Sequence, residues 1–338
     1  MNLRLVVIGT LGLCLSLYLV LYVGLGAVVS SAAAIGWGGF ASLCLYSLCL
    51  FPLMGAAWQV LFPAPARADL RVLVWARMVR DSAGDVLPFS QFGGIVLGAR
   101  AAVLHRVPSA LAFASTIVDV TTELLGQIAY IAIGVAILIA RAPRTSFAAS
   151  VTKVVVIGFV LAVIGGALFV FLQRFGHRIT GRLAARLLPR VLTSTGAVTD
   201  ALDAIYASPV RVALSASIHL AAWVASSITT WIAFRLIGAH IGIVSVIAID
   251  SLVGAAESAA VLVPHALGVQ EATYAVLAPL FGVGAEFGLA VSLLKRARDI
   301  AVGAPILLIW QALEGRRALD LGGDATARRD RETSARHR

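Results

Sequence analysis

Long apolar runs separated by short arginine-rich segments dominate the chain. About six of these runs are long enough to cross a bilayer core of roughly 30 Å. They cover residues 5–29, 38–62, 109–140, 150–173, 212–237 and 287–313. Two further apolar regions, 82–105 and 242–283, are interrupted by proline, glycine and charged residues. The pattern therefore predicts an all-α polytopic membrane protein in which two regions do not form simple spans.

The two interrupted regions carry similar residues in the same order. In each, an acidic residue is followed seven positions later by a proline and next by a glycine: Asp81, Pro88 and Gly93 in and just before the first region, Glu257, Pro264 and Gly268 in the second. Proline removes a backbone donor and disfavours helix at the preceding residue. We therefore expect two broken or re-entrant helical hairpins, with the prolines and glycines as hinges. Paired interrupted segments of this kind mark the binding site in many transporters.

The distribution of arginine predicts the orientation of the spans, because cytoplasmic loops carry the excess of basic residues. The basic segments are 67–80, with Arg67, Arg71, Arg77 and Arg80 in one loop, 174–211, and the tail after Glu314. Arg141 and Arg144 are the only contrary pair. With both termini cytoplasmic, one hairpin enters from each side of the membrane. This arrangement is an inverted-topology repeat, with repeat 1 at about 38–140 and repeat 2 at about 212–313.

The remaining segments complete the predicted organisation. Residues 1–313 form a single integral membrane domain, and the tail 314–338 is predicted to be a basic, disordered cytoplasmic segment. Residues 175–208 place arginines at four-residue spacing between leucines. This spacing predicts an amphipathic cytoplasmic helix that lies on the membrane surface or docks under the bundle.

Composition excludes several classes of protein. Apolar residues make up 60% of the 338 positions, charged residues make up 13%, and the net charge is +10. The positive charge is concentrated in a few segments, which favours anionic lipid over nucleic acid as its partner. No P-loop, metal-ligand spacing or nucleophile motif is present, and the three cysteines have no metal-type pairing. We therefore expect no cofactor and no metal, and a protein that is not an enzyme, although an intramembrane transferase stays open.

Two acidic residues lie in the middle of a predicted span. Asp119 and Glu123 are four residues apart and so share one helix face. An ionised side chain at the centre of a membrane helix costs about 2.5 to 3.5 kcal/mol, so both need partners or water. The expected partners are cations at the matching depth of the last span, beside Asp299: Lys295, Arg296 and Arg298. Such a network is either a structural clamp between the repeats or a head-group or proton site.

Other candidate substrate-binding residues lie around the hinges. Glu257 and Glu271 are suited to a cation, a proton or a sugar hydroxyl. Arg100 either contacts a phosphate or extends to the membrane surface. His265 follows Pro264 and is a weaker candidate ligand, whereas Gly93, Gly94 and Gly98 favour close helix packing.

The same segments resemble a known family. Pro88 to Arg100, Asp119 to Glu123 and Pro264 to Glu271 are similar to the lysylphosphatidylglycerol synthase transmembrane domains, also described as flippase-like domains. The run from Pro88 to Gly94 and the Arg296 to Asp299 cluster look like the hopanoid-biosynthesis-associated subgroup of that family. The resemblance implies a hopanoid or hopanoid glycoconjugate as cargo. Departures at Gly94, His265 and Ala266 weigh against transferring substrates from other branches.

The sequence therefore predicts a flippase-like protein of the bacterial cytoplasmic (inner) membrane. It would bind or translocate a hopanoid or another polar-headed lipid between the leaflets. In this hypothesis the polar head passes between Asp119 and Glu123 on one side and Arg296 and Asp299 on the other. The alternative is a membrane accessory or scaffold subunit for a lipid-biosynthetic enzyme.

Overall fold

The fold was obtained as a computed structural model, in which the described part of the chain is helical and contains no strand. The backbone is described for residues 33–63, 68–86, 91–187, 192–260, 266 and 268–336, and the side chains for 33–63, 68–86, 93–171, 196–260, 266 and 268–315. Pro88, Pro264 and His265, and the predicted first span 5–29, lie outside these residues.

Four helices of the described chain are long and apolar enough to cross a membrane. They are α3 (Trp37–Val60), α6 (Ser109–Arg141), the Ser146–Phe171 part of α7 (Ser146–Leu187), and α9 (Pro209–Leu236). They coincide with four of the predicted spans. The predicted last span, 287–313, lies within α12 (Ala285–Arg336), whose charged residues keep it out of this group.

Each interrupted region folds as two helices that pack against each other. The first pair is α4 (Leu70–Val86) and α5 (Gln91–Leu104), and the second is α10 (Ile243–Ala259) and α11 (Val269–Leu280). Of the predicted hinge residues that the structure describes, Gly268 caps α11 with a φ of 80°, a conformation that favours glycine, whereas Gly93 lies inside α5. The two helical pairs are therefore hairpins.

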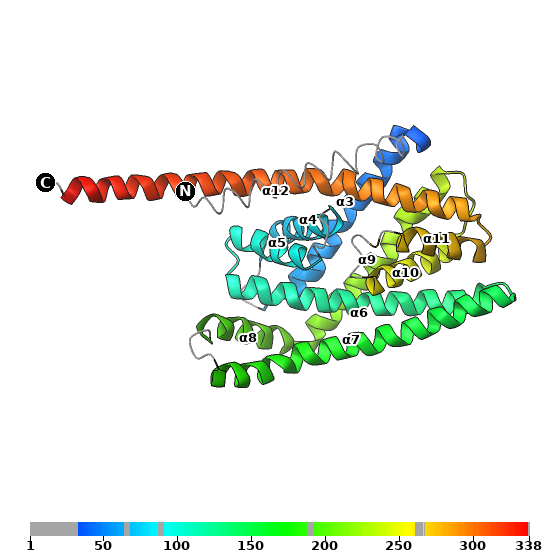
Figure 1. The fold of residues 1–338 in the computed structure, drawn as a ribbon, viewed down its shortest axis with the longest axis horizontal. Coiled ribbons are helices and arrows are strands. Elements are labelled where there is room, and N and C mark those ends of the chain that lie inside the picture. Colours follow the sequence, from blue (N-terminus) through cyan, green and yellow to red (C-terminus); the bar gives the residue numbers. More distant parts are fainter. Residues whose placement is uncertain are drawn as a thin grey trace.

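The hairpins lie toward opposite ends of the bundle (Figure 1). The α4–α5 hairpin lies at the end where α6 begins, and the α10–α11 hairpin lies toward the end where α6 joins α7. The packing partners are exchanged between the halves, because α4 packs on α12 whereas α10 packs on α6, and α3 packs on α9.

Small residues allow the closest of these contacts. A Cβ atom on Gly94 of α5 would lie 2.5 Å from the carbonyl oxygen of Arg80 on α4. A Cβ atom on Gly98 would lie 2.8 Å from the Cβ atom of Arg80. In the second half, a Cβ atom on Gly288 of α12 would lie 2.6 Å from the carbonyl oxygen of Tyr274 on α11. The glycines predicted to favour packing thus set the distance between the hairpin helices.

Two arginines assigned to a cytoplasmic loop are in fact inside the protein. Arg77 and Arg80 belong to α4 and are almost completely buried, with 1% and 7% of their surface exposed. The prediction was wrong because a count of basic residues cannot distinguish a solvated arginine from one that has acidic partners within the bundle. The first hairpin accordingly begins at Leu70, twelve residues before the predicted start of the interrupted region at residue 82.

Two predictions for the polar segments also need correction. The region 175–208 is not one helix: α7 continues to Leu187 and α8 (Leu192–Tyr206) follows it. Leu202 and Ile205 of α8 are buried in the same cluster as Ala112 of α6, so α8 docks on the bundle. The tail expected to be disordered continues α12 to Arg336, consistent with the absence of proline after Pro305.

Candidate functional site

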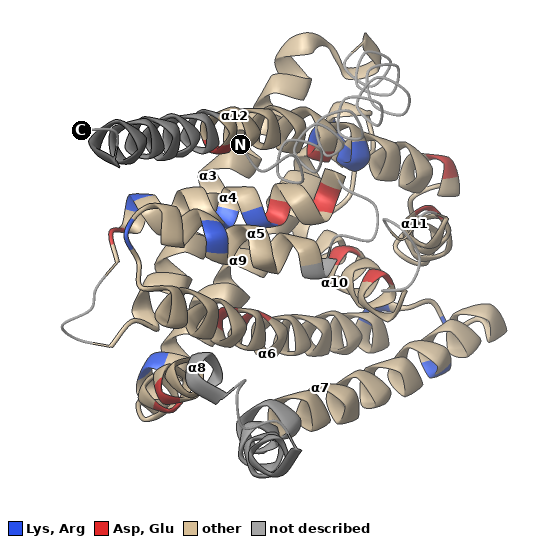
Figure 2. Cartoon of the chain, turned by 60° about the vertical axis from the view of Figure 1, so that its left-hand side comes forward, with Lys and Arg blue, Asp and Glu red and all other residues tan. Residues whose placement is uncertain are grey.

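The candidate site is built from charged side chains that lie inside the helical bundle. Figure 2 shows charged positions along α4, α10 and α12, whereas the described length of α7 is almost free of them. Three groups of ion pairs account for most of these internal charges. Each group ties a hairpin helix to a neighbouring helix or reinforces the start of a helix.

The first group joins α4 to α6. Asp119 is fully buried and accepts hydrogen bonds from Arg77 at 3.0 Å and from Arg80 at 2.7 Å. The same two arginines bind Glu123, one turn further along α6. They also bind Asp81 on their own helix. The planar guanidinium groups supply several donors each, so one arginine can serve more than one carboxylate.

His219 of α9 completes this group. Its Nε2 lies 3.0 Å from Oδ1 of Asp119, and its side chain is 2% exposed. Thr122 of α6 also meets α9, through a hydroxyl contact of 2.9 Å with Ser215. The partner of His219 is thus Asp119, one of the two acidic residues that the sequence singled out.

The expected pairing of Asp119 and Glu123 with cations of the last span is wrong. Their partners are Arg77 and Arg80 of the adjacent hairpin, in the same half of the chain. The error follows from the assignment of these two arginines to a loop, which removed them from consideration. Asp119 and Glu123 therefore clamp α4 to α6 in this structure.

The second group joins α10 to α12. Asp250 of α10 accepts hydrogen bonds from Lys295 of α12 at 2.7 Å, from Tyr274 at 2.9 Å and from Thr230 at 2.7 Å. Tyr130 of α6 adds a longer contact of 3.3 Å. Asp250 was missed by the sequence analysis, although an acidic residue within an apolar run is itself a signal.

The third group lies at the start of α11. Glu271 binds Arg296 of α12 and also accepts a hydrogen bond of 2.8 Å from the backbone amide of Gly268. This contact caps the helix with a carboxylate at its positive end. Glu271 is thus placed at the hinge predicted from the sequence, with one of the predicted cations as its partner.

The last charged positions lie around Asp299 of α12, between the two hairpins, and are called the meeting point here. Asp85 near the end of α4 is within electrostatic range of Glu257 of α10 and of Arg298 and Asp299 of α12. Arg298 binds the neighbouring Asp299 and reaches Ser47 of α3 at 3.3 Å. Neither Asp85 nor Glu257 makes a hydrogen bond or ion pair with a residue that the structure describes.

Accessibility distinguishes this meeting point from the other groups. Asp85 is exposed, and Glu257 and Asp299 are partly exposed, whereas Asp119 is fully buried and Asp250 is nearly so. Within the described residues, no group of three or more His, Cys, Asp or Glu side chains is arranged to hold a metal ion. The meeting point offers accessible carboxylates together with one guanidinium, which suits a polar organic group with hydroxyl and charged substituents.

Arg100 lies apart from this meeting point. It forms an ion pair of 2.6 Å with Glu314 of α12, and the Arg100 side chain is 53% exposed. Its place near the end of α5 fits the interpretation that it reaches the membrane surface. Of the predicted site residues, Glu257 lies within electrostatic range of Asp299, which Arg298 binds, and Asp85 joins them, whereas Arg100 and Asp119 bind other partners.

The fold and the charged interior define an all-helical membrane protein in which two internal hairpins carry intramembrane charges. The family described as the lysylphosphatidylglycerol synthase TM region matches residues 6–306, and the chain belongs to this family. No curated protein and no solved structure matches the chain. The family membership supports a function related to membrane lipids.

Proposed function

We propose that this protein moves a polar-headed lipid between the leaflets of the bacterial cytoplasmic membrane, without covalent chemistry and without a cofactor. A hopanoid or hopanoid glycoconjugate is the cargo implied by the resemblance of the Pro88 to Gly94 and Arg296 to Asp299 segments. The observation that carries the proposal is that Asp85 of one hairpin and Glu257 of the other are both within electrostatic range of Asp299 on α12, while the hairpins lie toward opposite ends of the bundle.

The proposal includes an inverted-topology repeat of α3 to α6 and α9 to α12. Its support is the exchange of packing partners, since α4 packs on α12 and α10 packs on α6. In such repeats the substrate site lies between the halves near the bilayer midplane, and rocking of one half against the other exposes it to each side in turn. Both termini are cytoplasmic in this arrangement.

The proposed route for the polar head differs from the one suggested by the sequence alone. Because Asp119 and Glu123 are engaged by two arginines, we place the route beside Asp85, Glu257 and Asp299 instead. Their carboxylates accept hydrogen bonds from the hydroxyl or amino groups of a head, and Arg298 attracts its anionic groups. The apolar part of the lipid stays in the bilayer.

The test is lipid movement in reconstituted vesicles. Vesicles are prepared with the full chain or with the D85N or E257Q variant, and the outward or inward movement of a fluorescent glycolipid is followed. D200N, on the exposed face of α8, is the control variant. Both site variants are expected to slow movement by roughly tenfold or more, by analogy with the loss of a charged hydrogen-bonding partner. D200N should match the unaltered chain.

Three other results would identify a different function. Unchanged movement in D85N and E257Q would overturn the proposed route. Movement that requires an added biosynthetic enzyme would identify an accessory or scaffold subunit. A covalently altered lipid would identify an intramembrane transferase. Mass spectrometry of lipid that co-purifies with the protein tests the hopanoid assignment.

A further inference from the structure

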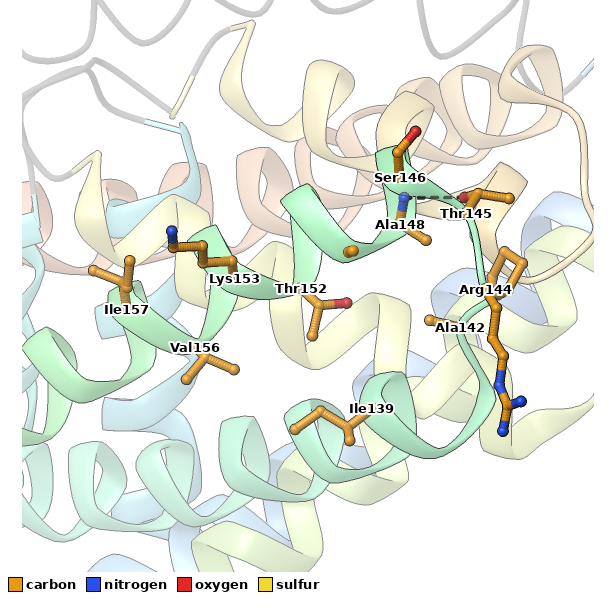
Figure 3. A pocket seen from close by; sticks show the side chains of 12 residues that line it. Ile139, Ala142, Arg144, Thr145, Ser146, Ala148, Thr152, Lys153, Val156 and Ile157 are labelled. Atoms are coloured by element: carbon orange, nitrogen blue, oxygen red, sulfur yellow. Dashed lines mark hydrogen bonds between the residues drawn. The ribbon is translucent and has the colours of Figure 1, made fainter.

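A groove lies at the end of the bundle where α6 joins α7, apart from the internal charges. It has a volume of about 750 Å³ and is lined by the last turn of α6 and the first turns of α7. Figure 3 shows Ile139 of α6 and Val156 of α7 on its two sides, with Arg144 in the connecting turn. The groove thus combines an apolar wall with a basic residue at its outer end.

Its two cations have no partner among the residues that the structure describes. Arg144 and Lys153 are both exposed, and neither makes a hydrogen bond or ion pair with a residue that the structure describes. The sequence contains no aspartate or glutamate between Glu123 and Asp200, so no neighbouring acidic residue along the chain offsets them. The internal cations Arg77 and Lys295, by contrast, each have carboxylate partners.

The position of Lys153 in the helix makes an ammonium group without an anionic partner energetically costly. It lies eight residues beyond Thr145, which corresponds to about 12 Å along a helix at 1.5 Å per residue. The candidate span of α7 begins at Ser146, and a head-group layer is only about 5 to 8 Å thick, so within such a span the base of Lys153 lies at the level of the acyl chains. Its flexible stem can reach toward the surface, where a lipid phosphate would satisfy the ammonium group.

We propose that this groove binds an anionic phospholipid of the leaflet at the α6–α7 end. The phosphate contacts Arg144, and Lys153, which points away from Arg144 in Figure 3, turns toward the phosphate when the lipid binds, while one acyl chain lies along Ile139, Val156 and Ile157. The N-terminus of α7 does not define the site, because Thr145 already caps it by accepting a hydrogen bond of 3.1 Å from the amide of Ala148. Arg144, half of the pair that contradicts the orientation predicted from the basic loops, thereby acquires a function that does not depend on the transport proposal.

The experiment measures lipid retained by the full chain. Protein is reconstituted with equal amounts of phosphatidylglycerol and phosphatidylcholine of the same acyl chains, and bound lipid is counted by native mass spectrometry. The R144Q/K153Q variant is expected to lose at least roughly tenfold in phosphatidylglycerol retention, since each basic residue near a membrane surface contributes about a fivefold factor. Retention of phosphatidylcholine should stay the same.

Two further variants separate the groove from general charge and from misfolding. R71Q/R106Q removes two exposed arginines elsewhere and should retain phosphatidylglycerol like the unaltered chain. A149W places a large side chain at an exposed lining position and should reduce retention by roughly threefold without changing the charge. Equal losses in R71Q/R106Q and R144Q/K153Q, or full retention in R144Q/K153Q, would overturn the proposal.

Discussion

Asp119 on α6 and Lys295 on α12 carry opposite charges but have the same structural role in the two halves of the chain. Asp119 binds Arg77 on α4, the first helix of one hairpin, and Lys295 binds Asp250 on α10, the first helix of the other. In each half, a buried ion pair therefore joins a hairpin to the long helix that follows it. Removing one partner of such a pair leaves an uncompensated buried charge, which is costly.

We predict that D119N destabilises the folded protein by about 3 kcal/mol. The substitution removes the negative charge that Arg77 and Arg80 share while keeping the shape of the side chain. The free energy of unfolding in mixed micelles, followed by circular dichroism, measures the effect. R100Q, which breaks the exposed pair with Glu314, should change it by less than about 1 kcal/mol. Similar values for the two variants would argue against the clamp.

The second clamp can be tested with a double-mutant cycle. K295M is expected to cost about 3 kcal/mol, because Asp250 keeps its hydroxyl partners but loses the opposite charge. D250N in the same chain removes the stranded charge, so the double variant should be more stable than the sum of the single effects predicts, by about 1 kcal/mol or more. Strict additivity would mean that the pair is not coupled.

Substitution of a tightly packed glycine of α5 by alanine should lower the stability of the protein. G94A would place its Cβ atom 2.5 Å from the carbonyl oxygen of Arg80, and we expect a loss of about 2 kcal/mol as α5 is pushed from α4. G84A on α4 meets no atom within 4 Å and should be neutral or slightly stabilising, since alanine favours helix over glycine. Unfolding midpoints of the two variants compare a packed glycine with a free one.

Cysteine labelling tests the arrangement of the hairpins. After replacement of the native cysteines, single cysteines at Arg71 and Arg106 should react with an impermeant reagent from one side of the membrane. Single cysteines at Gly242 and Glu286 should react from the other side, because the second hairpin lies toward the opposite end of the bundle. Reaction of the Arg71 and Arg106 positions from different sides would eliminate the first hairpin as a re-entrant element.

Local signals were sufficient for the helices and their interruptions. Four predicted spans coincide with α3, α6, α7 and α9. A helix that crosses a membrane core must be long and apolar, and both properties can be read directly from the sequence. The hinges were visible because proline and glycine change the backbone at their own positions, as at Gly268. The unusual cost of charge in an apolar run also identified Asp119 and Glu123 as residues that need partners.

The sequence by itself thus determined the class of protein, four long apolar helices, and two residues, Asp119 and Glu123, whose charge must be compensated. Only the tertiary structure decided which charges meet, pairing Asp119 with Arg77 and Arg80 and placing Asp85 and Glu257 within electrostatic range of Asp299. The reason is physical: helix formation and hinge geometry depend on neighbours along the chain, whereas ion pairing depends on how separate helices pack. A count of basic residues along the sequence contains no information on that packing.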